Sequence, residues 1–138
     1  MSNEEDGDHS RTRSLKQRWD EEDAARDKLQ RRAKELFLEE QGKQIFAPIE
    51  EYLTRVDNVL RGFGASVYIN PTWEHLDDQR LRRVIKVRST QPDQQLSLDF
   101  EIHGARIFHR DRSYQSSRDA EMLVRVIAEQ IEQFLKPR

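Results

Sequence analysis

The sequence contains no cysteine, which excludes disulfides, thiolate metal sites and a cysteine nucleophile. This absence is typical of proteins in a reducing compartment, and we expect a cytoplasmic location. The N-terminus is acidic and has no apolar stretch, so we expect no signal peptide. No apolar run approaches the roughly 18 residues of a membrane span. The sequence therefore predicts a soluble protein without a membrane partner.

Hydrophobic residues are scarce, at 35% of the 138 residues, and charged residues reach 36%. Globular chains usually have about 45–50% apolar residues, glycine included, and about 25% charged residues. Large apolar side chains are sparse before Leu36, whereas the composition from Ile45 onward is ordinary. We therefore expect a disordered tail over residues 1–14, a charged helical arm over 15–42 and a single α+β domain over 43–138.

The arm consists of good helix formers, and Gly42 is expected to end it. One side of this helix carries residues at alternating spacings of four and three: Leu15, Trp19, Glu22, Arg26, Leu29, Ala33 and Leu36. Because two of these are charged, the pattern favours a mostly solvated helix over a strong coiled coil. Trp19, the tryptophan of the arm, is expected either to anchor another chain or to fold back on Val84 and Phe108.

Apolar residues recur at intervals of three and four in two later segments. This periodicity predicts amphipathic helices over about 44–62 and 118–136. Four β-rich segments lie between them, at 66–70, 81–89, 96–102 and 105–110. The fold class is therefore α+β, with an antiparallel four-stranded meander and both helices packed on one face of it.

Two turn signals predict the register of the meander. A turn at residues 103–104 places Phe100 opposite Ile107, and a four-residue loop at 91–94 places Val87 opposite Leu98. Both registers collect apolar side chains on one face. On the other face they place opposite charges across from one another: Glu101 with Arg106 and Asp99 with Lys86.

The chain offers few candidates for chemistry. Its serines and glycines form neither a nucleophile motif nor a phosphate loop. His75 lies in an acidic loop, which we interpret as solvated rather than metal-binding. His109 falls on the core face, where we expect a neighbouring group to satisfy it. We therefore predict a non-enzymatic protein without catalytic residues, metal ligands or cofactor.

Basic residues gather on the second predicted strand, from Arg80 to Arg88, and around the fourth. An aromatic side chain among arginines on an open sheet face resembles the arrangement that stacks nucleic-acid bases. The net charge of −2 argues against that function. We therefore predict an interaction module that contacts a protein partner or self-associates through the sheet face and the N-terminal helix. The alternative is a nucleic-acid-binding accessory protein. The candidate binding residues are Arg88, Arg106, Phe108, Arg110 and Trp19.

No recognisable family motif resembles the predicted hairpin, the stretch Asn70–Trp73 or the C-terminal helix.

Overall fold

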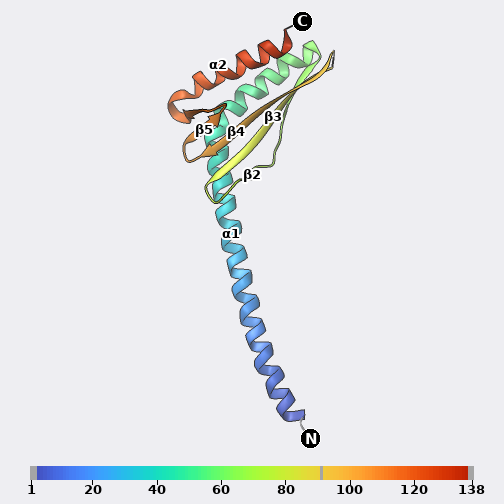
Figure 1. Cartoon of the computed structure of the whole chain (residues 1–138), viewed down its shortest axis with the longest axis vertical. Coiled ribbons are helices and arrows are strands. Elements are labelled where there is room, and N and C mark those ends of the chain that lie inside the picture. Colours follow the sequence, from blue (N-terminus) through green and yellow to red (C-terminus); the bar gives the residue numbers. More distant parts are fainter. Residues whose placement is uncertain (1–2, 91, 137–138) are drawn as a thin grey trace. The chain divides into compact units, whose positions relative to one another are not determined.

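The computed structural model describes residues 3–90 and 92–136, with side chains from Ser14 onward. The chain divides into two compact units, Met1–Leu36 and Phe37–Arg138. Its elements, labelled in Figure 1, are α1 (Asn3–Leu60), the 3₁₀ turn η1 (Arg61–Phe63), β1 (Ala65–Ile69), β2 (Glu74–His75), β3 (Arg80–Thr90), β4 (Asp93–His103), β5 (Arg106–His109), β6 (Arg112–Gln115) and α2 (Ser116–Leu135). In the described part of the chain, no helix is long and apolar enough to cross a bilayer.

The strands form one antiparallel sheet in the order β1-β3-β4-β5-β6, and β2 also pairs with β3. This confirms the α+β class and the antiparallel meander. The predicted number of four strands was too low, because β2 and β6 were missed. The turn before β6 is made by Arg110 and Asp111, with φ angles of 49° and 63°. Neither residue is the glycine that usually marks such a turn, although aspartate tolerates this conformation.

The observed register differs from the predicted one at both hairpins. Val87 pairs with Leu96 rather than Leu98, and Ile107 pairs with Ile102 rather than Phe100. The second turn is formed by residues 104–105, with Gly104 at a φ of 61°. Each partner is displaced by two residues, so every side chain keeps its predicted face.

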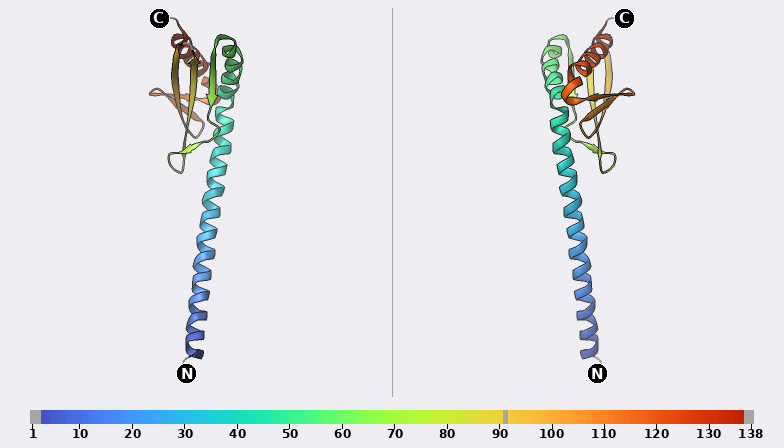
Figure 2. Two further views of the ribbon diagram at one scale, coloured as in Figure 1. Left: turned by 90° about the vertical axis from the view of Figure 1, so that its right-hand side faces the viewer. Right: turned by 90° about the vertical axis from the view of Figure 1, so that its left-hand side faces the viewer.

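One face of the sheet is covered by α2 and by the C-terminal half of α1, as predicted (Figure 2). These helices bury apolar side chains at helical spacing against alternate residues of the strands. The largest fully buried side chains are Phe46, Ile49 and Leu53 of α1, Leu81, Ile85, Leu98, Phe100 and Ile107 of the sheet, and Leu123 and Ile127 of α2. The opposite face of the sheet carries polar and charged side chains.

The predicted helix end at Gly42 was wrong, because α1 continues through this position to Leu60. A Cβ atom at residue 42 would lie 2.7 Å from Cδ1 of Leu81, which is fully buried. Glycine here therefore permits α1 to approach β3 closely. The predicted arm over 15–42 and helix over 44–62 belong to one continuous helix. A disordered tail was predicted over residues 1–14. The structure does not describe the side chains of residues 1–13, so the tail stays a prediction.

Pro48 lies inside α1 and removes the N–H that would bond the carbonyl of Gln44. Figure 1 shows α1 changing direction where its colour passes from cyan to green, as expected of a proline-containing helix. Close to this point, the hydroxyl of Ser116 donates a hydrogen bond to the carbonyl oxygen of Ile45 at 2.6 Å. The start of α2 is thereby fixed to α1.

Candidate binding surface

The open face of the sheet carries arginines whose charges are matched locally. Arg82 donates to both carboxylate oxygens of Asp99, at 2.6 to 3.0 Å, and to Glu74 at 3.2 Å. The hydrogen bonds to Asp99 raise the pKa of Arg82 further above its usual value. Arg80 likewise donates to Asp77 at 2.7 Å. This face therefore has less free positive charge than its arginine content indicates.

The ion pairs have different partners from those predicted. Asp99 is bound by Arg82 rather than Lys86, and the nearest cation to Glu101 is Arg80 at 3.9 Å rather than Arg106. The displacement of both registers explains the exchange, because it changes which outward-facing residues are neighbours. The expectation that Asp99 and Glu101 are paired with basic groups is thereby retained.

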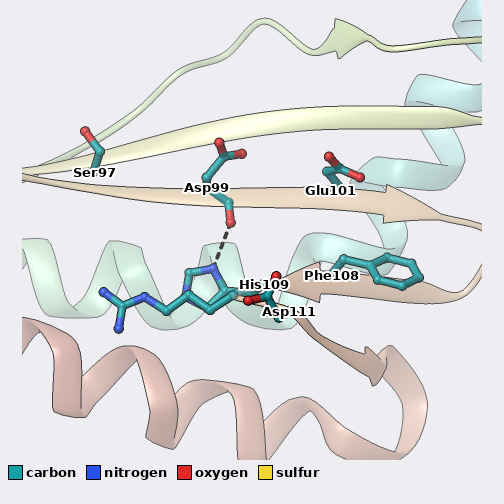
Figure 3. Close-up of a pocket in the computed structure, with 7 residues that line it drawn as sticks. Ser97, Asp99, Glu101, Phe108, His109 and Asp111 are labelled. Carbon is teal, nitrogen blue, oxygen red and sulfur yellow. Dashed lines mark hydrogen bonds between the residues drawn. The ribbon is translucent and has the colours of Figure 1, made fainter.

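A groove of about 510 Å³ opens where β5 ends beside the longer strand β4. β5 pairs only with residues 101–103 of β4, so most of β4 continues beyond it. Side chains from β4, from β5 and from the following turn line the groove: Ser97, Asp99, Glu101, Phe108, His109 and Asp111 (Figure 3). The groove combines an aromatic ring, three carboxylates and the edge of a strand.

His109 forms the inner wall of this groove and is 3% exposed. Its ring stacks on Phe100, with 4.5 Å between the ring centroids. Its Nδ1 lies 2.7 Å from the carbonyl oxygen of Asp99, the bond drawn in Figure 3. A carbonyl can only accept, so Nδ1 carries the proton, and Nε2 of the neutral ring is an acceptor. The predicted place of His109 on the core face is confirmed.

Gln130 of α2 connects His109 to Arg110. With its amide nitrogen turned toward His109, Gln130 donates to Nε2 at 3.1 Å. Its amide oxygen then accepts from Nε and Nη1 of Arg110, at 3.0 and 3.1 Å. The opposite amide orientation would set donors against donors, so the network favours this assignment. A continuous chain of hydrogen bonds thus joins the β5–β6 turn, α2 and the backbone of β4.

The structure brings only some of the predicted binding residues together. Phe108, 38% exposed, and Arg110 line the same groove. Arg106 lies beside them on β5 and donates to Oγ of Ser113 at 3.0 Å. Arg88 lies toward the other end of the sheet, six residues along β3 from the row of Phe108, or about 20 Å. Arg88 contacts Asp93 instead, at 3.6 Å.

The fifth predicted binding residue, Trp19, belongs to the first compact unit and is 62% exposed. Its contact with Val84 and Phe108 stays a prediction. Sequence reasoning also missed Ser97 and Asp111 as groove residues. A signal was available for Asp111, since a short strand pair at residues 106–115 would have required a turn there.

Arg83, a member of the predicted basic cluster, belongs instead to the core face and is 6% exposed. Its guanidinium lies 4.3 Å from the centroid of the Trp73 ring, and its Nε donates to the carbonyl of Asn70 at 2.8 Å. Nη1 reaches Glu50 at 3.4 Å. Arg83 therefore holds the segment before β2 against α1 and is not available to a ligand.

The side chains of the acidic loop around His75 contact other groups of the protein. Nε2 of His75 lies 3.4 Å from Glu39 of α1, and Asp77 accepts from the backbone N–H groups of Gln79 and Arg80 at 2.8 Å. Among the described side chains, of residues 14–90 and 92–136, no three acidic or histidine residues are grouped as metal ligands.

No protein-family model, curated protein or solved structure matches this chain.

Proposed function

We propose that this protein is a non-enzymatic interaction module that self-associates through its N-terminal helix. The observation that carries the proposal is the exposure of every described residue from 14 to 34 of α1. Large apolar side chains lie among them, with Trp19 62% and Leu29 71% exposed. A helix with such residues on one side gains stability by burying them against a partner.

A second copy of the chain suits this helix when the two copies run antiparallel. In a parallel pair, identical seam residues face each other, so Glu22 meets Glu22 and Arg26 meets Arg26. In an antiparallel pair centred on Ala24, Glu22 of each copy faces Arg26 of the other copy. Trp19 then faces Leu29. The two charged seam positions therefore favour the antiparallel arrangement.

The flanking positions limit the strength of this association. In the antiparallel pair Asp23 lies beside Asp23 of the second copy, and Arg18 lies beside Arg32 of the second copy. Like charges at these positions oppose the pairing. We therefore expect a reversible dimer whose population depends on protein concentration.

Charge reversal tests the proposal on the full chain by sedimentation velocity. Glu22→Arg and Arg26→Glu should each weaken the dimer about tenfold, and the double variant should restore it. An equimolar mixture of the two single variants should form heterodimers, because each helix then carries one sign of charge. Mixing leaves the charges within each helix unchanged, so it separates the contact between helices from effects inside one helix.

Orientation can be read from single cysteines, since the chain has none of its own. In the antiparallel pair, residue 25 of one copy lies beside residue 25 of the other. The variant Ala25→Cys should therefore form a disulfide-linked dimer on mild oxidation. Ala33→Cys is the matched control, because antiparallel copies hold it about 27 Å apart. Crosslinking through residue 33 alone would show a parallel pair. An unchanged monomer mass at all concentrations would overturn self-association.

Nucleic-acid binding remains the alternative, supported by Arg106 and Phe108 on one open face. The pairing of Arg82 with Asp99 and the carboxylates of the groove disfavour it. Titration of the full chain with single-stranded RNA at low salt distinguishes the two functions. Binding that falls steeply with added salt and weakens in Arg106→Ala would favour the alternative.

A further inference from the structure

The groove beside β4 contains an open strand edge. In an antiparallel sheet, the N–H and C=O groups of alternate residues point to opposite neighbours. The carbonyl of Asp99 points toward the β5 side, where it meets His109. Gln95 and Ser97 lie four and two residues earlier on β4, so their backbone groups point to the same side. Among the described residues, no hydrogen-bond partner is found for the backbone of Gln95 or Ser97.

The opposite edge of the sheet, formed by β1, is protected by a side chain. The outward N–H of Val67 on β1 donates to Oδ1 of Asp57 at 2.8 Å, so a side chain of α1 occupies that edge. Folded proteins generally protect their edges with such contacts, with proline or lysine, or with bulges. Residues 93–99 of β4 contain no proline or lysine, and the β3–β4 register runs without a bulge. The β4 edge is therefore open and unprotected.

The groove beside this edge is acidic. Asp99, Glu101 and Asp111 contribute three carboxylates to its lining. The lining also includes Arg110, whose guanidinium donates to the amide oxygen of Gln130 and keeps its charge, so three carboxylates face one cation. Of the carboxylates, Asp99 alone forms a close ion pair with an arginine of the sheet, at 2.6 Å. Glu101 lies 3.9 Å from Arg80, but Arg80 binds Asp77 more closely, at 2.7 Å. The negative charge that Glu101 and Asp111 leave in the groove is complementary to a basic segment.

We propose that β4 binds an extended, basic peptide segment of a partner protein by strand addition at Gln95 and Ser97. The added strand continues the line of β5 past the turn at Arg110. It exchanges backbone hydrogen bonds with the edge, and its outward-facing basic side chains reach Glu101 and Asp111. Backbone pairing supplies affinity in this mode of recognition, and side chains supply selectivity. This site is separate from the N-terminal helix and does not depend on its self-association.

The probe is the fluorescein-labelled peptide TKVRVKVT, titrated into the full chain and followed by fluorescence anisotropy. The matched peptide TEVEVEVT has the same strand propensity and the opposite charge, and it should not bind measurably. A third peptide carries N-methyl groups on alternate residues, which remove the donors of one strand edge. Its affinity should fall about tenfold, without any change to the protein.

Amide hydrogen exchange locates the bound peptide. In the free protein, the amides of Leu96 and Leu98 face β3 and should be protected, whereas those of Gln95 and Ser97 should exchange fast. Saturating TKVRVKVT should slow the exchange of Gln95 and Ser97. Protection that grows with protein concentration alone would show that a second copy occupies the edge, and would overturn the peptide proposal.

Two substitutions with matched controls complete the test. Ser97→Pro removes an outward N–H without removing a β3–β4 bond, so it should lower the affinity about tenfold, whereas Ser97→Ala should not. Asp111→Asn keeps a residue that tolerates positive φ and should weaken binding about threefold. Glu121→Gln changes the net charge equally on α2 and should have no effect. Failure of TKVRVKVT to bind, or equal binding of TEVEVEVT, would overturn the proposal.

Discussion

The Nδ1 atom of His109 lies 2.7 Å from the carbonyl oxygen of Asp99, at the point where β5 ends and the backbone ladder on this side of β4 stops. The imidazole thus replaces a backbone donor. His109→Phe keeps the stacking on Phe100 but leaves the carbonyl and Gln130 without this partner. We expect the free energy of unfolding to fall by about 2 kcal/mol, measured by urea denaturation at neutral pH.

His103→Phe is the matched control for that substitution, because His103 is exposed at the end of the neighbouring strand β4. Its effect should stay within about 0.5 kcal/mol. Gln130→Leu should also destabilise the protein, and combining it with His109→Phe should cost less than the two separate effects together. Full additivity would show that the two residues do not act as one network.

Gly42 and Gly62 should respond oppositely to alanine. Alanine at residue 42 gains about 1 kcal/mol of helix propensity but forces its Cβ against buried Leu81, which costs about 1–3 kcal/mol. A Cβ at residue 62 meets nothing within 4 Å. We expect a lower melting temperature for Gly42→Ala and an equal or higher one for Gly62→Ala. A stabilised Gly42→Ala would show that Leu81 can move aside.

Arg83 should contribute to stability rather than to binding. Arg83→Met removes the donor to the Asn70 carbonyl and the cation over the Trp73 ring. The free energy of unfolding should fall by about 2 kcal/mol in urea. Arg88→Met, on the exposed face of the same strand, should change it by less than about 0.5 kcal/mol. Equal effects of the two substitutions would contradict the assignment of Arg83 to the core.

Asp119 should make the protein sensitive to acid. The backbone N–H of Gln115 donates to its carboxylate at 3.0 Å, and this bond, with Arg118 nearby, lowers its pKa. Because the folded-state pKa is the lower one, the resulting stability is present above the unfolded value of about 4 and is lost as pH falls through the folded value. Thermal unfolding from pH 5 to about pH 2 should therefore show a smaller loss for Asp119→Asn than for the wild type. Glu121→Gln, in the same helix, should follow the wild type.

The faces of the meander could be predicted because alternation along each strand has a period of two. A register error of two residues leaves Phe100, Ile102 and Ile107 in the core. The residue pairs themselves could not be predicted. At each turn, a register shifted by two residues keeps the same alternation of apolar and polar side chains. This also explains why the partner of Asp99 was misassigned, although its pairing with a basic residue was anticipated.

The features that sequence reasoning missed depend on tertiary contacts. Gly42 has the residue type of a helix end, and only its distance to Leu81 shows that it serves close packing. Arg83 lies among other arginines in sequence, and its burial follows from the position of Trp73. The groove exists because β5 is short and turns at Arg110 without glycine, and no local pattern indicated that length.

The hydrogen bond between Ser116 and Ile45 joins residues 71 positions apart. It has a consequence for the order in which the chain folds during synthesis. The β3–β4 hairpin is local and can close early, but its apolar face needs α2, which the ribosome produces later. Until α2 emerges, α1 alone covers the apolar face of the sheet, and chaperones can bind the part that stays exposed. Completion of the fold therefore waits for the C-terminal helix.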